Sequence, residues 1–336
     1  MKNWKVRLEV GNYCNLKCPF CVREIVNKKS LNTIHLSLDT VKKFLPRTFL
    51  RFRVSNVYLS GAVAEPTLNP YFIDIVKYLM SHSKVTIDSN GSTNNIEWWK
   101  ELGKTGVKCT FAPDSIKPKN NKYRINSNTD KVIENIKAFT DAGGKSTWKF
   151  ITYSHNEDEL EEQKKIAKNL GSDFTFAQPR LIPKLLEDKI SFTSSSLIKK
   201  DKDQISYTDN NTPDYYCKLF GDIGDYLIEI SPEGIVYPCC MMPRDFYFVY
   251  ENFFLFGDTT PNLTTEKKEP KRISFINTIV PLIEKNGGIQ SLSLHNYSIQ
   301  EILKSPFYDV LLKKTWEDKC SFCNNFCNSR KYDLKQ

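Results

Sequence analysis

The sequence has no apolar run of about 18 residues, the length that a membrane-spanning helix needs. Its first ten residues, MKNWKVRLEV, are largely polar and charged and lack the apolar segment of a secretory signal. Histidine is scarce too, since the four residues at positions 35, 82, 155 and 295 show no metal-ligand spacing. We therefore expect a cytoplasmic protein without a membrane span or a histidine metal site.

The charge balance gives little indication of a partner. Lysine and arginine number 48 against 39 aspartates and glutamates, which gives a formal net charge of +9. An excess of this sign can mark nucleic-acid binding, because phosphate contacts dominate the affinity of such proteins. Here the excess is mostly lysine, scattered along predicted helices, and no aromatic-basic RNA-binding motif accompanies it. We interpret it as solvated surface and do not predict a nucleic-acid partner.

Cysteine, in contrast, is abundant, with ten residues in 336. Thiols stay reduced in the cytoplasm, so this abundance indicates metal binding rather than disulfides. Cys14, Cys18 and Cys21 lie in the run GNYCNLKCPFC, at C-x3-C-x2-C spacing after a short apolar strand. Three thiolates can hold three irons of a 4Fe-4S cluster, which leaves the fourth iron open. The alternatives are a three-cysteine zinc loop, which lacks a local fourth ligand, and unrelated buried thiols.

This run resembles the cluster motif of the radical S-adenosylmethionine (radical SAM) superfamily, C-x3-C-x-aromatic-C, with Phe20 in the aromatic position. The resemblance implies that Cys14, Cys18 and Cys21 bind a 4Fe-4S cluster whose open iron chelates SAM. In that family, one electron from the reduced cluster cleaves SAM to methionine and a 5′-deoxyadenosyl radical, which takes a hydrogen atom from the substrate. A reductant such as flavodoxin or ferredoxin is then an expected partner.

The first half of the chain alternates strand and helix patterns, which is typical of βα units with a parallel sheet. A helix is expected to start at the N-cap Ser37, and others in PYFIDIVKYLM and NTDKVIENIKAFTDAGG. The expected strands are residues 6–10, 54–60, 84–90, 107–113, 146–152 and 173–179. Six units predict an α/β fold, a partial (β/α)6 barrel of the TIM type, with its chemistry at the carboxyl ends of the strands.

The sequence predicts three regions. Residues 1–180 form the radical SAM partial barrel, residues 181–215 a polar linker without periodicity, and residues 216–336 a small cluster-binding module. In the last region, YLIEISPEGIVYPCC predicts a β-hairpin around Pro232-Glu233-Gly234. The segment SIQEILKSPFYDVLLKKTW predicts a helix interrupted near Pro306.

The family resemblance also implies residues that contact SAM. The segment SGAVAEPTLNP stands where the family has a Gly-Gly-Glu-Pro type motif, so Glu65 is expected to bind the SAM ammonium through a charge-assisted hydrogen bond. Ala62 and Ala64 replace glycines that are often found there. The alternative for Glu65 is a turn-capping role.

Further SAM contacts are implied at the third and fourth strands. Ser89 and Asn90, in the run DSNG, are similar to the family's Thr-Asn-Gly, which approaches the ribose and carboxylate of SAM; an ordinary turn is the alternative. Asp114 aligns with the Asp of an F-x-x-D motif, and Arg124 with the Arg of a Tyr-Arg pair, a candidate contact for the SAM carboxylate. Their alternatives are a helix cap or a surface ion pair.

Two positions are judged from alternation alone. Trp148 and Lys149 are neighbours in the fifth strand, so one of them is expected to point into the barrel. Cys109 alternates with Val107 and Phe111 in the fourth strand and is expected to be a buried apolar residue.

The C-terminal third resembles the Twitch module, the shortened form of the SPASM domain, which holds an auxiliary 4Fe-4S cluster through a C…G-x4-C…C-x2-C layout. The implied ligands are Cys217, Cys239, Cys320 and Cys323, with Cys240 and Cys327 as possible replacements. The competing interpretation is a structural zinc site of four thiolates.

We therefore expect a radical SAM enzyme that oxidises or rearranges a small-molecule or sugar-type substrate, since no peptide-recognition domain is visible ahead of the barrel. The alternatives are an enzyme that modifies a ribosomal peptide, RNA modification, and a non-catalytic iron-sulfur sensor. The alanines near Glu65 keep the sensor alternative open.

Overall fold

The computed structural model describes residues 3–19, 21, 23, 33–61, 63–117, 122–177, 225–238 and 279–312. The strands are β1 (Asn3–Leu8), β2 (Val54–Leu59), β3 (Lys84–Ser89), β4 (Lys108–Phe111), β5 (Lys145–Ile151), β6 (Asp173–Ala177), β7 (Asp225–Ile230) and β8 (Val236–Tyr237). They form one eight-stranded sheet in the order β6-β5-β4-β3-β2-β1-β7-β8. All neighbouring strands pair in parallel except β7 and β8, which are antiparallel.

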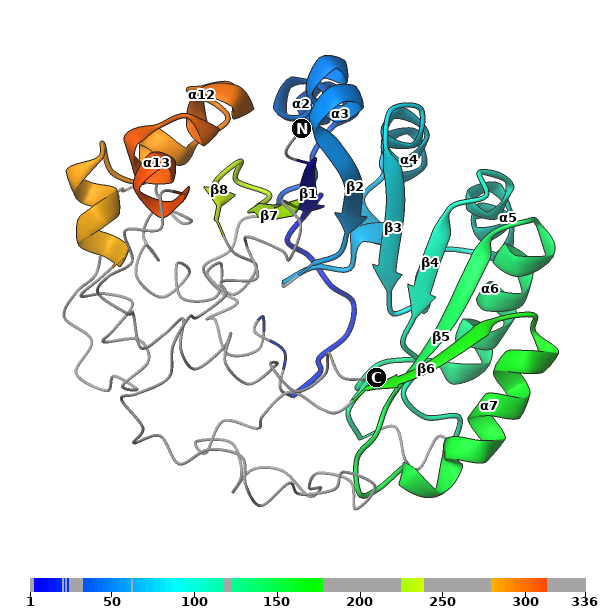
Figure 1. Cartoon of the computed structure of the whole chain (residues 1–336). Helices are drawn as coiled ribbons and strands as arrows, with labels where there is room; N and C mark the ends of the chain where they lie inside the picture. The colour runs from blue at the N-terminus through cyan, green and yellow to red at the C-terminus, as the bar shows by residue number, and fades with distance from the viewer. Residues whose placement is uncertain are drawn as a thin grey trace.

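Helices cover the outer side of the curved sheet, as Figure 1 shows. The α-helices are α2 (Leu38–Phe44), α3 (Arg47–Arg53), α4 (Phe72–Met80), α5 (Ile96–Lys104), α6 (Thr129–Asp141), α7 (Leu160–Asn169), α12 (Ile299–Leu303) and α13 (Pro306–Leu312). Residues 279–285 are also helical. Short 3-10 turns lie at η2 (Pro66–Leu68), η4 (Glu157–Glu159) and η6 (Ile289–Leu292). No helix in these described parts is long and apolar enough to cross a bilayer.

The elements expected from the sequence are present. The six predicted strands correspond to β1 to β6, with bounds that differ by no more than about three residues, the usual uncertainty at strand ends. The Ser37 hydroxyl caps α2 by accepting a hydrogen bond from the backbone N–H of Thr40, as the N-cap prediction requires. The interruption near Pro306 is confirmed, since α12 ends at Leu303 and α13 begins at Pro306. Proline is well suited to a first helical position because it lacks the N–H that would have no partner there.

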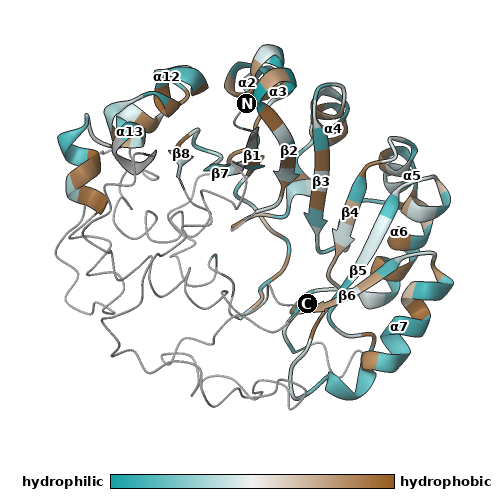
Figure 2. Ribbon diagram, viewed as in Figure 1, coloured by the Kyte–Doolittle hydropathy of each residue, from teal (hydrophilic) through white to brown (hydrophobic). Residues whose placement is uncertain are grey.

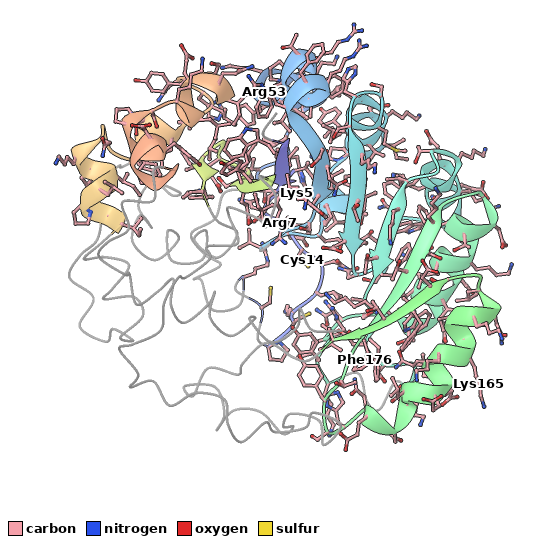
Figure 3. All side chains as sticks on the ribbon, viewed as in Figure 1. Lys5, Arg7, Cys14, Arg53, Lys165 and Phe176 are labelled. Carbon is pink, nitrogen blue, oxygen red and sulfur yellow. The ribbon has the colours of Figure 1, made fainter. Side chains whose placement is uncertain are left out.

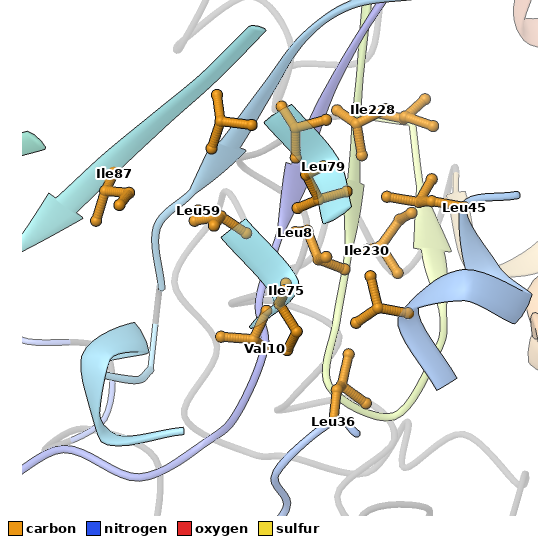
Figure 4. Packing of buried hydrophobic residues seen from close by; sticks show 14 of the residues in the cluster. Leu8, Val10, Leu36, Leu45, Leu59, Ile75, Leu79, Ile87, Ile228 and Ile230 are labelled. Carbon is orange, nitrogen blue, oxygen red and sulfur yellow. The ribbon is translucent and has the colours of Figure 1, made fainter. Parts of the chain in front are cut away.

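The main hydrophobic core lies between the sheet and its outer helices. Figure 4 shows Leu8, Leu59 and Ile87 of the strands packing with Ile75 and Leu79 of α4, and all five side chains are fully buried. Each such side chain contributes roughly 1.5–3 kcal/mol relative to an exposed one. Figure 2 shows the corresponding pattern, with hydrophobic residues on the sides of the helices that face the sheet and hydrophilic residues on the outside.

The predicted hairpin around Pro232-Glu233-Gly234 is confirmed, and it joins the main sheet. Strand β7 pairs in parallel with β1, so that Arg7 lies opposite Glu229 and Leu8 opposite Ile230. Ile228 and Ile230 alternate in phase with Val6 and Leu8 and extend the same buried face. The hairpin therefore shares the core of the barrel. The predicted linker, residues 181–215, lies outside the described residues, so the domain boundaries remain a prediction.

The alternation of the strands defines an outer and an inner face of the sheet. On β5, the Trp148 indole N–H donates a hydrogen bond to Gln163 Oε1 of α7 at 2.8 Å, so Trp148 faces the helices. Lys149 therefore points to the inner face, and it is the residue of the predicted pair that enters the barrel. Cys109 is fully buried on the outer face, which confirms its predicted role as an apolar core residue.

Candidate functional site

The cysteine loop leaves the carboxyl end of β1. Cys18 is 6% exposed and Cys14 and Cys21 are half-buried, and all three are free thiols. The loop is held by local hydrogen bonds: Cys21 N–H donates to the Cys18 carbonyl at 3.0 Å, and Leu16 N–H donates to the Cys14 sulfur at 3.4 Å. Figure 3 labels Cys14 in the segment that follows β1. Phe20 lies outside the described residues.

The surroundings of these thiols oppose ionisation unless a cation is present. Burial raises the pKa of Cys14 to about 12, and the negative charges of Glu65, Cys21 and Cys18 contribute to the shift. Burial likewise raises the pKa of Cys18 to about 11, although Arg124 partly offsets this effect. Metal binding requires thiolates, and a metal cation supplies the charge that stabilises them.

The donor set therefore fits an iron-sulfur cluster. It offers three cysteine sulfurs, the soft ligands of such clusters, at one end of a buried sheet. The described residues contain no group of three or more His, Cys, Asp or Glu side chains suited to hold one metal ion. A cluster differs from such a site because each thiolate binds a different iron.

Glu65 connects the loop after β2 to the end of β3 and to the cysteine loop. It is 4% exposed, and its Oε1 accepts hydrogen bonds from the hydroxyls of Ser89 at 2.7 Å and Thr67 at 2.6 Å. Its Oε2 accepts from the Asn90 backbone N–H at 2.8 Å, and its own N–H donates to the Tyr13 carbonyl at 2.9 Å. The turn-capping alternative is also realised, since Oε1 accepts from the N–H of Thr67 at the start of η2.

The charge of Glu65 has no partner in the part of the chain that the structure describes, because its contacts there are all hydrogen bonds from neutral groups. Burial raises the pKa of Glu65 above its ordinary value, and the hydrogen bonds from Asn90, Thr67 and Ser89 only partly counter this. A neighbouring cation would stabilise the ionised form. Just before Glu65 the chain turns tightly at Gly61, where a Cβ atom would lie 2.5 Å from the Ala64 carbonyl oxygen.

Asn90 joins the end of β3 to the cysteine loop. Its side-chain N–H donates to Asn15 Oδ1 at 3.0 Å and lies 3.9 Å from the Cys14 sulfur. Its Oδ1 accepts from the Ser92 backbone N–H, and the following Gly91 has a φ of 72°, as a turn requires. The run DSNG therefore forms a turn, as the simpler alternative expected, and this turn also contacts the cysteine loop.

Asp114, which follows β4, and Arg124 form a buried ion pair that lies next to the cysteine loop. Asp114 is 2% exposed and adopts a φ of 61°, and its Oδ2 accepts from Arg124 Nε. Its Oδ1 accepts from the Ile151 backbone N–H at 3.2 Å. Arg124 Nη1 in turn lies 3.8 Å from the Cys18 sulfur. The surface-ion-pair alternative is wrong, because both side chains are largely buried at the carboxyl edge of the sheet.

The ion pair keeps its arginine charged. Burial alone disfavours the guanidinium, but the Asp114 carboxylate and the Cys18 sulfur outweigh this, so that the pKa of Arg124 lies above its ordinary value. Tyr123 supports the same side chain, with the Arg124 guanidinium carbon 5.3 Å from its ring centroid.

The structure thus gathers Cys14, Cys18, Glu65, Ser89, Asn90, Asp114 and Arg124 at one edge of the sheet. The predicted auxiliary ligands Cys217, Cys239, Cys320 and Cys323 lie outside the described residues.

Sequence reasoning missed Asn15 and Thr67. Asn15 holds Asn90 and donates to Ser92 Oγ at 2.8 Å, and Thr67 binds Glu65. Asn15 stands between two cysteines of the motif, and Thr67 follows Glu65 by two residues. These positions next to predicted site residues could have indicated both residues as candidates.

The chain is similar to known proteins in sequence and in fold. Residues 8–167, just under half of the chain, match the family model described as the radical SAM superfamily. The chain is similar to the GTP 3′,8-cyclase of Haemophilus ducreyi, with 27% identity over 119 residues, 34% of each protein. The Yersinia pestis enzyme of the same name is 25% identical over 150 residues, 42% of this chain and 44% of the relative. The matches thus span less than half the length of these curated relatives.

Solved structures share the fold. SuiB of Streptococcus suis bound to S-adenosylmethionine superposes with a TM-score of 0.54 and 17% identity, over 72% of this chain and 61% of that one. The anSMEcpe structure with bound AdoMet gives a TM-score of 0.52 and 12% identity, over 91% of this chain and 82% of that one. The predicted α/β fold of the partial TIM-barrel type is confirmed at this level.

Proposed function

We propose that this chain is a radical SAM enzyme, which binds a 4Fe-4S cluster through Cys14, Cys18 and Cys21 and uses it to cleave S-adenosylmethionine reductively. The observation that carries the proposal is the position of the cysteine loop, whose sulfurs lie beside Asn90 and Arg124 at the carboxyl edge of a parallel sheet. When bound, the cluster supplies one electron to the SAM sulfonium, and the resulting 5′-deoxyadenosyl radical takes a hydrogen atom from the substrate.

The residues around the loop suit the methionine part of SAM. Glu65 is buried and carries no ionic partner among the described residues, so the SAM ammonium is the cation that we assign to it. Asn90 and Arg124 are assigned to the polar groups next to the cluster, since both already reach its cysteines. Ser89 and Asp114 are assigned as positioning residues, because their side chains are engaged with Glu65 and Arg124.

Cysteine spacing supports a second part of the proposal. Cys217, Cys239, Cys320 and Cys323 hold an auxiliary 4Fe-4S cluster in a Twitch-like module of residues 216–336, and a flavodoxin or ferredoxin in the cytoplasm supplies the electron.

We propose a small-molecule or sugar-type substrate. The similarity to GTP 3′,8-cyclases, whose name indicates a nucleotide substrate, supports this choice. Modification of a peptide is the second candidate, since SuiB was solved with its precursor peptide SuiA and anSMEcpe with the Cp18Cys peptide. These structural relatives support the fold only, because their identity to this chain is 16% and 13%.

The experiment measures iron and electron paramagnetic resonance (EPR) on the anaerobically reconstituted full chain. Changing Cys14, Cys18 and Cys21 together to Ala should remove about four irons per chain. In the reduced wild-type protein, added SAM should alter the EPR spectrum, and the triple variant should lose this response. Cys109→Ala is the matched control, because Cys109 is buried on the outer face of the sheet and should retain both properties. Retention of iron and of the SAM response by the triple variant would refute the proposal.

A further inference from the structure

The inner face of strands β4 to β6 carries a group of polar side chains that the proposed SAM site does not use. On β5, Ser146 and Trp148 contact the outer helices, through hydrogen bonds to Thr140 and Gln163 at 2.8 Å each. The residues that alternate with them, Thr147 and Lys149, therefore point to the inner side. The strand thus presents a hydroxyl and an ammonium, two residues apart, toward the interior of the barrel.

Neighbouring strands add further hydroxyls to this group. In the sheet register Thr110 of β4 lies opposite Thr147, and Thr175 of β6 lies opposite Lys149. Residues opposite one another on adjacent strands are about 5 Å apart and share a face. On this face Lys149 therefore has Thr175 opposite it, Thr147 two residues before it and Thr110 diagonally across, and Asp173 of β6 lies opposite Thr147.

Thr147 provides the observation that points to a ligand. It is 8% exposed, and within the described ranges its hydroxyl oxygen has no hydrogen-bond partner. A buried hydroxyl without a partner costs free energy, and nearly all such groups in native proteins are satisfied by protein, water or a ligand. A valine would fill the same volume without this cost, so the sequence retains a polar group where packing does not require one.

Lys149 lies two residues from Thr147 on the same face of β5, and its ammonium group can bind an anion. Its ammonium has no hydrogen bond or ion pair within the part of the chain that the structure describes. Its positive charge lowers the pKa of Asp114, whose carboxylate is already paired with Arg124. Asp114 also accepts a hydrogen bond from the N–H of Ile151, two residues after Lys149, so the group adjoins the cluster site.

We propose that Lys149 and the Thr147 hydroxyl bind an anionic oxygen group of the substrate, a phosphate or a carboxylate. Both groups donate hydrogen bonds, and the lysine adds a full positive charge, which is the chemistry that such an anion requires. Thr110 and Thr175 stand on either side and can bind further oxygens of the same molecule. This inference rests on the proposed function, because it assigns the inner face to the substrate of the radical reaction.

Calorimetry on the full, reconstituted, SAM-bound protein tests the inference, with inorganic pyrophosphate and citrate as probes. Thr147→Val and Lys149→Gln should each weaken binding of the recognised probe by about tenfold, the typical effect of losing a hydrogen bond to a charged group. Lys165→Gln is the control, since Lys165 is an exposed lysine of α7 that Figure 3 shows on the outside. It should bind the probe as the wild type does.

The variant Thr147→Val distinguishes a role of the Thr147 hydroxyl in binding the probe from a role in stabilising the fold. The variant should melt at a higher temperature than the wild type, because it removes an unpaired buried hydroxyl, and it should still lose probe affinity. A higher melting temperature with unchanged affinity overturns the inference, as does binding of neither probe by the wild type. Binding of pyrophosphate supports a phosphate-bearing substrate, and binding of citrate supports a carboxylate.

Different results would refute the proposed function and the proposed anion site. The same wild-type preparation is assayed for 5′-deoxyadenosine release from SAM under reducing conditions. If SAM is cleaved while the variants bind the probe like the wild type, only the present inference is wrong. If the wild type does not cleave SAM, the proposed function is wrong.

Discussion

The side chain of Asn90 bridges strand β3 and the cysteine loop, because its Nδ2 donates to Asn15 Oδ1 at 3.0 Å and lies 3.9 Å from the Cys14 sulfur. The backbone N–H of the same residue donates to Glu65 Oε2 at 2.8 Å. One asparagine therefore fixes the relative positions of Cys14, the proposed cluster ligand, and Glu65, the carboxylate assigned to SAM. Groups that are held in place by such hydrogen bonds lose less entropy when a ligand binds.

The Glu65 carboxylate should determine SAM affinity. Glu65→Gln keeps the size of the side chain but removes the charge that we assign to the SAM ammonium. We expect SAM binding to weaken by about ten- to a hundredfold, which corresponds to the 1.5–3 kcal/mol of a hydrogen bond to a charged group. Calorimetry with SAM on the reconstituted protein measures the effect, and the iron content should not change.

An exposed glutamate provides the control for this variant. Glu97→Gln changes the same functional group on the surface of α5 and should leave SAM affinity unaltered. If Glu65→Gln binds SAM as tightly as the wild type, Glu65 acts only as the cap of η2 and as a link to Ser89.

The ion pair between Asp114 and Arg124 should contribute strongly to stability. Arg124→Met leaves the buried Asp114 carboxylate without its partner, which should lower the free energy of unfolding by about 3–5 kcal/mol. Adding Asp114→Asn removes the unpaired charge, so the double variant should be more stable than Arg124→Met alone. Urea denaturation of the wild type, Arg124→Met, Asp114→Asn and the double variant measures the differences. Costs of the two single changes that add up to the cost of the double change would show that the two residues are not coupled.

Glu233 should make stability depend on pH. Burial raises the pKa of Glu233 to about 7 from an ordinary value of 4.5, and the nearby Glu9 carboxylate contributes to the shift. The folded protein therefore holds this proton more tightly than the unfolded chain does. The free energy of unfolding should fall as pH rises from about 4.5 to about 7 and then level off, by roughly 3 kcal/mol at most.

Two variants isolate this contribution. Glu233→Gln should flatten the decline in unfolding midpoint between pH 5 and pH 7, because its side chain does not titrate, whereas Glu134→Gln on the exposed face of α6 should retain it. Equal pH profiles for the wild type and Glu233→Gln would show that Glu233 is hydrated and titrates normally.

Alternation and capping account for most of what the sequence predicted correctly. The strands from β1 to β6 could be found because apolar residues such as Val6 and Leu8 recur with period two and bury against helices. The cysteine spacing predicted a cluster loop because three thiols in one short segment have few other uses, and the cluster itself stays a prediction. The sequence also predicted that Glu65 lies at the carboxyl edge of the sheet, because Glu65 follows β2 just as the cysteine loop follows β1.

Other features depend on contacts between distant segments. The pairing of β7 with β1 joins residues more than two hundred positions apart, so local patterns could assign the hairpin only to a separate module. The bridge from Asn90 to Asn15 and the pair of Arg124 with Asp114 likewise became visible once the carboxyl ends of the strands were brought together. Parity alone could not orient Lys149, which required the contact of Trp148 with α7.

The auxiliary cluster should be separable from the SAM cluster. Changing Cys320 and Cys323 to Ala should lower the iron content from about eight to about four per chain. It should also make the segments that carry the proposed ligands sensitive to protease, whereas β7 should stay protected because it pairs with β1 in the main sheet. Metal analysis and limited proteolysis measure these effects. One zinc per chain, lost on this change while iron is unaffected, would identify the second motif as a structural zinc site.

Reductive cleavage of SAM is the measurement that tests the central claim most directly. The reconstituted full chain is incubated with SAM and dithionite without oxygen, and 5′-deoxyadenosine is quantified by chromatography. We predict slow release of 5′-deoxyadenosine by the wild type even without substrate, and none when Cys14, Cys18 and Cys21 are all changed to Ala. A wild-type protein that holds its clusters and binds SAM but releases no 5′-deoxyadenosine would contradict the account and favour a sensor. Equal release by the triple variant would contradict it as well.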